Sequence, residues 1–153
     1  MRALLVLAIV VAPAVAGAGV VFHGNHAIAT AELDELARQR APTSQDELVE
    51  LAGDVQLVYF DRGYADAVAN VAPDKSIHIV EGKRYKFGKI SAAGLPAGVV
   101  RAKTGEYFTH AIVVADVQRL SDAAKAPVTS EVHVDSKART IDVSYAVQRT
   151  LSK

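Results

Sequence analysis

The sequence predicts an α+β protein made of two tandem units, each with the element order strand, helix, helix, strand, strand. Two observations support this fold class. Short apolar runs bounded by Gly, Pro or Asn alternate with longer segments whose apolar residues recur every three or four positions. The same order returns about 65 to 70 residues further along the chain, as expected of an internal duplication.

The first strand is predicted at residues 20–22, where an apolar run ends in a Gly24-Asn25 turn. A helix follows, with Thr30 as the expected N-cap residue. Pro42 ends this helix because proline cannot continue it.

A second helix is predicted from Ser44, since Ser44 and Glu47 have the spacing of a capping box. Its apolar residues form one stripe, and Gly63 is expected to end it as a C-cap. Two strands follow, at residues 65–71 and 76–80, to complete the first unit.

The second unit repeats this pattern with a shortened first helix. A strand is predicted at residues 86–91, and Pro96 and Gly98 leave room for a helix of only one or two turns before Gly105. Thr109 is expected to cap the long helix. A hairpin of strands at residues 129–134 and 140–147 closes the unit.

The balanced charge of the chain argues against a charge-driven partner. Its 153 residues include 17 basic and 17 acidic side chains and no Cys. Such a chain has no net field to attract nucleic acid, so no nucleic-acid partner is expected. The absence of Cys also excludes disulfides and a lipid-modified amino-terminal cysteine.

The amino terminus has the features of an export signal. An apolar run follows Met1-Arg2, and small residues lie near its end at the spacing that signal peptidase requires. We therefore expect residues 1–18 to be a cleaved signal peptide. An uncleaved membrane anchor stays open as an alternative, because no charged residue occurs between Ala3 and Phe22.

Several short motifs, in this order, resemble those of the POTRA domain, the periplasmic module of outer-membrane assembly proteins of the BamA and TamA type. The residues that carry the resemblance are Gly24, Asn25, Gly63, Tyr64, Glu81 and Gly82. Residues 105–109 also resemble the start of the family's long helix. The resemblance covers the periplasmic part without the barrel, and it divides the chain into POTRA-like domains at residues 19–83 and 84–149.

The resemblance implies a three-stranded mixed sheet in each domain, covered on one face by helices, and a role in binding and not in catalysis. In this family an extended segment of another protein pairs with an exposed edge strand, which is called β-augmentation. The implied edges are residues 65–71 and 129–134. The partner-binding residues expected there are Asp66, Val68, Asn70, Thr129, Glu131 and His133.

The expected partners are unfolded or nascent outer-membrane proteins, or an outer-membrane barrel subunit on another chain. The expected location is the periplasm, with a peripheral association with the outer membrane allowed. If the amino terminus is not cleaved, the alternative is an inner-membrane-anchored docking protein of a division or secretion complex.

No cofactor, metal ion or catalytic residue is predicted. His23 and His26 lie close together, but no Cys or carboxylate at ligand spacing accompanies them, so solvated turn histidines are the preferred interpretation over a metal site. A small exported enzyme is the remaining alternative. It would need a site that joins His78 or His133 to Ser and Asp residues in space.

Overall fold

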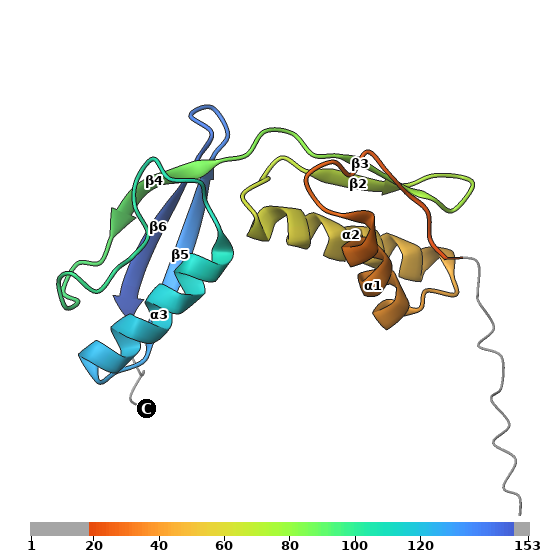
Figure 1. Cartoon of the computed structure of the whole chain (residues 1–153). Coiled ribbons are helices and arrows are strands. Elements are labelled where there is room, and N and C mark those ends of the chain that lie inside the picture. The colour runs from red at the N-terminus through yellow and green to blue at the C-terminus, as the bar shows by residue number, and fades with distance from the viewer. Residues whose placement is uncertain (1–18, 149–153) are drawn as a thin grey trace, which may run out of the picture.

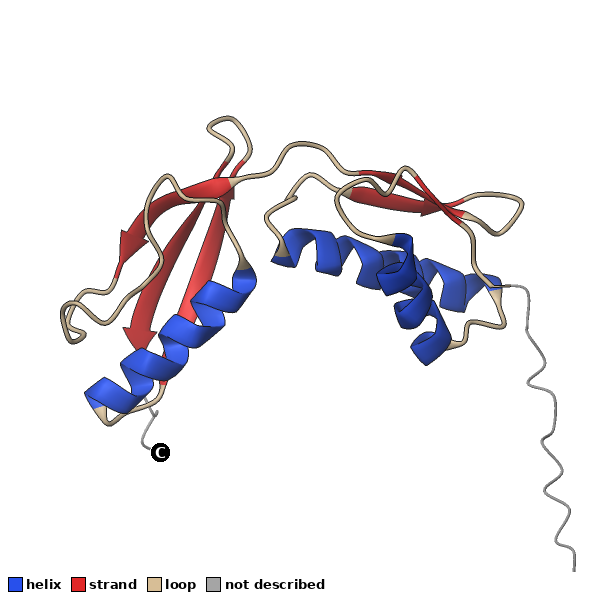
Figure 2. Cartoon of the chain, viewed as in Figure 1, coloured by secondary structure: helices blue, strands red, loops and turns tan. Residues whose placement is uncertain are grey.

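The computed structural model describes residues 19–148, which form two small β-sheets, each covered on one face by helix (Figure 1, Figure 2). The predicted signal peptide at residues 1–18 lies outside the described residues, as does residue 149 of the predicted second domain. No helix within the described range is long and apolar enough to cross a membrane.

The first sheet contains β1 (Phe22–His23), β2 (Val68–Val71) and β3 (Ile77–Val80) in the order β1-β3-β2. β1 is parallel to β3 and β2 is antiparallel to it, so the expected mixed sheet is confirmed. The helices α1 (Thr30–Arg40) and α2 (Gln45–Asp61) cover one face, as Figure 2 shows. Between them lies an apolar core that includes Leu33, Leu51, Val55, Tyr59, Ile77 and Ile79.

In the first domain, one helix start agrees with the sequence and the other differs. The capping box at α2 is confirmed, because Ser44 Oγ accepts from the Glu47 N–H at 3.2 Å and Glu47 Oε2 accepts from the Ser44 N–H at 3.0 Å. The prediction that Thr30 caps α1 was wrong. Ala29 is the N-cap, and the Thr30 hydroxyl instead accepts a hydrogen bond from Asn25 Nδ2 at 2.9 Å.

The end of α2 explains why β2 is shorter than predicted. Arg62 caps the helix and Gly63 follows with φ of 90°. The Gly63 and Tyr64 N–H groups return to the carbonyls of Phe60 and Tyr59, which is a Schellman motif. The Ala67 N–H then donates to the Tyr64 carbonyl, so residues 65–67 form a turn and not a strand.

The second sheet repeats the order of the first. It contains β4 (Lys86–Ser91), β5 (Val128–Asp135) and β6 (Thr140–Val147) in the order β4-β6-β5, with β4 parallel and β5 antiparallel to β6. The single helix α3 (His110–Ala124) covers one face (Figure 1). Its core includes Phe87, Phe108, Val113, Leu120, Ile141 and Val143.

The short first helix expected in the second domain is absent. Residues 92–109 contain turns and extended backbone but no helical residue. Gly94, Gly98 and Gly105 all have positive φ, between 75° and 87°, which is incompatible with a right-handed helix. The last part of this segment lies beside β4, since the Gly105 N–H donates to the Phe87 carbonyl at 2.8 Å.

Tyr85 links the two domains through its main chain. The Tyr85 N–H donates to the Gly63 carbonyl at 2.7 Å, and the Phe108 N–H donates to the Tyr85 carbonyl at 3.0 Å. The ring of Phe60, at the end of α2, lies 5.8 Å from that of Phe108 and contacts the second core. These contacts fix the orientation of the second domain on the end of α2.

Candidate functional site: the edge strands

Both strands predicted to bind a partner lie at the edge of their sheets. β2 is the last strand of the first sheet and β5 the last strand of the second. On β2, Val68 and Asn70 are exposed, whereas Ala69 faces the core. On β5, Thr129, Glu131 and His133 are exposed. Because side chains alternate across a strand, each set lies on the sheet face that turns away from the helices.

Asp66 differs from the other five predicted binding residues. It lies in the turn before β2, so its placement in a strand was wrong. Its Oδ2 accepts a hydrogen bond from the hydroxyl of the buried Tyr85 at 2.7 Å. Asp66 therefore takes part in the contact between the domains.

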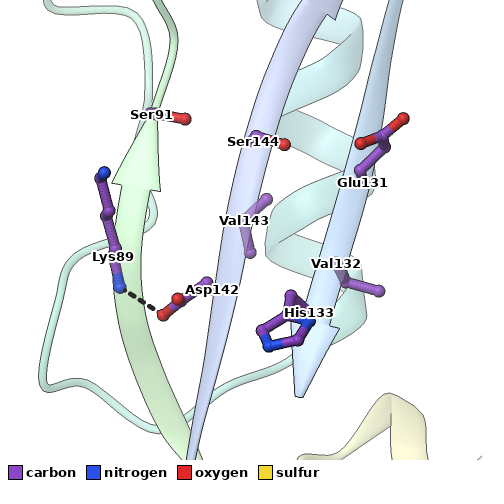
Figure 3. A pocket seen from close by; sticks show the side chains of 8 residues that line it. All are labelled: Lys89, Ser91, Glu131, Val132, His133, Asp142, Val143 and Ser144. Carbon is purple, nitrogen blue, oxygen red and sulfur yellow. Dashed lines mark hydrogen bonds between the residues drawn. The ribbon is translucent and has the colours of Figure 1, made fainter. Parts of the chain in front are cut away.

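The outer face of the second sheet has a hollow that is lined mainly by polar side chains (Figure 3). It brings His133 near Asp142, its register partner on β6, and near Ser144. In the part of the chain that the structure describes, no hydrogen bond joins the imidazole to either side chain. Asp142 Oδ1 instead accepts from the Lys89 N–H at 2.7 Å. The hollow therefore contains His, Asp and Ser but no proton relay.

The carboxylate of Asp142 has a structural role in the second sheet. Gly88 and Lys89 together oppose Asp142 where the register of β4 and β6 shifts, which is a β-bulge. A Cβ atom at Gly88 would collide with Asp142 Oδ1. Glycine therefore leaves the space that this carboxylate occupies, and a larger residue would displace it.

His78 also joins a chain of Ser and Asp residues, but in an order that does not suit catalysis. The buried Ser76 hydroxyl donates to Asp74 Oδ1 at 2.6 Å, and His78 Nε2 lies 3.1 Å from the same hydroxyl. The hydroxyl and N–H of Ser76 lower the pKa of Asp74. Because the serine proton is directed to Asp74, the imidazole cannot act as its general base. These hydrogen bonds among Asp74, Ser76 and His78 hold the turn between β2 and β3.

The histidine that lies beside His78 is His23. Their ring centroids are 4.8 Å apart, and both residues lie at paired positions of β1 and β3. Among residues 19–148, no group of three or more His, Cys, Asp or Glu side chains is placed to hold a metal ion. His26 contributes its backbone N–H to Glu81.

The carboxylate of the motif residue Glu81 joins the loop before α1 to the last turn of α2. Glu81 Oε1 accepts from the His26 and Ala27 N–H groups at 2.6 and 2.7 Å and from the Tyr59 hydroxyl at 2.7 Å. Burial alone would raise the pKa of Glu81, but these three donors outweigh it and lower the pKa. Burial and the carboxylate together raise the pKa of Tyr59.

The turn motif is fixed by the same part of the sheet. Gly24 has φ of 83°, and a Cβ atom there would collide with the Ile79 carbonyl oxygen. Asn25 Nδ2 donates to the Ile28 carbonyl at 3.1 Å. Gly82, with φ of 72°, turns the chain out of the first domain directly after Glu81.

Sequence reasoning missed the corresponding carboxylate of the second domain, Asp116. It is fully buried in α3 and accepts from the Arg101 and Ala102 N–H groups at 2.8 and 2.9 Å, from Arg119 at 2.6 Å and from the Tyr145 hydroxyl at 3.2 Å. Burial raises its pKa, and the hydrogen bonds reverse this and lower it. Its position on the apolar stripe with Val113 and Leu120 was the signal that could have revealed it.

Two basic side chains at the start of the second domain, Arg84 and Lys86, make contacts within the molecule. Arg84 Nε donates to the Arg62 carbonyl at 2.9 Å, and its guanidinium lies 4.7 Å from the ring centre of Tyr107. The Lys86 ammonium lies 5.6 Å from the same ring. Both cations therefore stack on one aromatic side chain beside β4.

No protein-family model and no curated protein matches the sequence. Solved structures do match. The crystal structure of POTRA domains 3–5 of BamA from Haemophilus influenzae is 15% identical with a TM-score of 0.54, over 86% of this chain and 61% of that chain. The chain has a tandem POTRA-like fold.

Two further solved structures match with lower TM-scores. CdiB from Escherichia coli is 19% identical with a TM-score of 0.48, over 86% of this chain and 27% of that chain. POTRA domains 1–3 of Omp85 from Anabaena are 17% identical with a TM-score of 0.39, over 87% of this chain and 65% of that chain. The chain spans less than two thirds of the length of each of these structures, and the POTRA-like assignment depends on the BamA match.

Proposed function

We propose that this protein is a non-enzymatic, exported scaffold of POTRA type that binds extended segments of other proteins by β-augmentation. The proposed clients are unfolded or nascent outer-membrane proteins, or an outer-membrane barrel subunit, and the proposed location is the periplasm. One observation supports this function: each of the two POTRA-like domains has an exposed strand, β2 or β5, at the edge of its sheet.

The arrangement of polar groups also favours binding over catalysis. The Asp74, Ser76 and His78 chain directs its serine proton to the carboxylate, and His133 has no hydrogen bond to Asp142 or Ser144 among the described residues. The carboxylates of Glu81 and Asp116 each accept hydrogen bonds from two backbone N–H groups and a tyrosine hydroxyl. These hydrogen bonds hold loops in place, which is a structural role.

Photo-crosslinking in cells tests the proposal. A photoreactive residue is placed at Asn70 or His133, which project from the two edge strands, and at Val49 on the opposite side of the first domain as a control. Adducts of the edge positions with nascent outer-membrane proteins or a barrel subunit are expected. Adducts no different from those of Val49 would overturn the proposal.

The same experiment separates the alternative location. Adducts confined to inner-membrane division or secretion complexes would favour the anchored docking protein. The mass of the protein from an envelope fraction then distinguishes a chain that has lost residues 1–18 from one that retains them.

A further inference from the structure

The two edge strands differ in how many main-chain donors they offer to a partner. In an antiparallel pair, N–H and C=O groups of alternate residues point toward the neighbouring strand, and those between them point away. Only the outward-pointing groups can bond an added strand. Which residues point outward follows from the hydrogen bonds at each strand.

On β2, the outward donors are largely occupied. The Ala69 N–H donates to Gln56 Oε1 at 3.2 Å, so Ala69 points away from β3, and Val71 shares its direction. Just before the strand, the Ala67 N–H donates to the Tyr64 carbonyl at 3.1 Å. Among Ala67, Ala69 and Val71, only Val71 has an N–H group without a hydrogen-bond partner in the described residues. The Gln56 side chain, which projects from α2, therefore closes the middle of this edge.

On β5, the outward donors are open over a longer strand. The Gln148 N–H donates to the Pro127 carbonyl at 2.8 Å, so the odd-numbered residues of β5 face β6. The Val128 N–H points outward and is taken by Ser121 Oγ at 3.0 Å. Ser130, Val132 and Val134 follow in the same direction, and their N–H groups have no partner in residues 19–148. An added strand would find three successive donors here.

The side chains that border this edge differ between its two faces. On the helix side, Val132 is 42% exposed although its partner Val143 is buried. On the outer side lie Glu131 and His133, and the Glu131 carboxylate has no ion-pair partner among the described residues. An added strand with apolar side chains toward α3 and basic side chains on the outer face would match both sides, since opposite charges on neighbouring strands attract.

We propose that β5 is the docking edge of this protein, that Gln56 keeps β2 closed, and that the preferred partner is an extended segment in which apolar and basic residues alternate. This inference rests on the proposed scaffold function and assigns it to one of the two domains. The chain would then take one such segment at a time.

The test uses a short peptide in which valine and lysine alternate, added to the wild-type protein and to two variants. Peptide stoichiometry is measured by calorimetry, and the perturbed amides are identified by NMR. Wild type is expected to bind one peptide, with perturbed amides at Ser130, Val132 and Val134. Gln56→Ala removes the acceptor that closes β2, so a second peptide should bind there. Gln56→Glu keeps an acceptor oxygen and should bind one.

Three controls address the edge and the charge. Val132→Pro removes the central outward donor on an edge strand, where proline is tolerated, and should weaken binding about tenfold or more. Ala69→Pro removes a donor that is already occupied and should leave the affinity unchanged. A peptide that alternates valine and glutamate should bind more weakly than the lysine peptide, and equal binding would overturn the charge preference.

The outcomes separate this inference from the scaffold function. Binding of the peptide at β2 in wild type, or one peptide on Gln56→Ala, would overturn the assignment to β5 or the closure by Gln56 while leaving β-augmentation intact. Failure of every variant to bind any extended peptide would overturn β-augmentation itself.

Discussion

The Tyr85 hydroxyl donates a hydrogen bond of 2.7 Å to Asp66 Oδ2, and this bond joins the start of the second domain to the turn that precedes β2 in the first. Tyr85 is fully buried, and its backbone N–H and carbonyl also bond to Gly63 and Phe108. One residue therefore connects both domains through its main chain and its side chain.

Removing this hydroxyl should loosen the joint without unfolding either domain. Tyr85→Phe loses one hydrogen bond to a carboxylate and should lower the free energy of unfolding by about 1 to 2 kcal/mol. Urea denaturation measures the loss, and NMR relaxation should show more independent tumbling of the domains. Asp66→Asn keeps an acceptor oxygen and serves as the control with a smaller effect. Unchanged tumbling in Tyr85→Phe would contradict this role.

Glu81 should make the stability of the first domain depend on pH in the acidic range. Its folded-state pKa is lowered from the ordinary value of 4.5. A lowered pKa contributes stability that is fully present above the unfolded pKa and is lost as the pH falls through the folded pKa. In Glu81→Gln, the free energy of unfolding should therefore fall less steeply below about pH 4.5 than in wild type. Parallel curves from urea denaturation at each pH would contradict this assignment.

Asp116 should be essential for the irregular segment at residues 92–109. Asp116→Ala leaves the Arg101 and Ala102 N–H groups and the Tyr145 hydroxyl without their acceptor, which should cost about 3 kcal/mol or more. Hydrogen exchange should show lost protection at the Arg101 and Ala102 amides. Asp116→Asn retains an oxygen and should be intermediate. If both amides kept their protection in Asp116→Ala, the carboxylate would not be what holds this segment.

The β-bulge in β4 should tolerate no side chain at Gly88. Gly88→Ala places a Cβ against Asp142 Oδ1 and Thr140, and should destabilise the protein by about 1 to 3 kcal/mol. Gly53→Ala is the matched control, because a Cβ there has open space on a helix and should stabilise by about 0.5 to 1 kcal/mol. Thermal unfolding measures both. Adding Asp142→Ala to Gly88→Ala should recover part of the loss, and no recovery would mean that the clash lies elsewhere.

The order of elements was predictable because periodic apolar residues and local caps determine it. The Ser44 and Glu47 box and the Gly63 stop depend on neighbours within a few residues, so their signals are complete in the sequence. The mixed sheets and their edge strands were predicted from the family resemblance. Thr30 was misplaced by one position because Ala29 takes the extended conformation of the cap without a side-chain bond.

The features that escaped prediction depend on contacts between distant residues. Asp116 bonds to residues 14 and 15 positions earlier, and Gln56 bonds to Ala69, 13 positions later. The apolar stripe of α3 marks Asp116 as buried, but neither pair of hydrogen-bonded residues leaves a local pattern that identifies the partner. The partner-binding residues themselves stay predictions, since the structure places five of them on edge strands but contains no partner.

The joint at Gly63, Tyr85 and Phe108 is closed by backbone N–H and carbonyl groups. Such bonds persist whatever side chains the participating residues carry. Substitutions at Tyr85 and Phe108 can therefore alter packing and leave in place the backbone hydrogen bonds that set the angle between the domains. Gly63 is the exception, because an added Cβ would lie 2.7 Å from the Phe108 carbonyl oxygen, so the angle between the domains depends on a residue without a side chain.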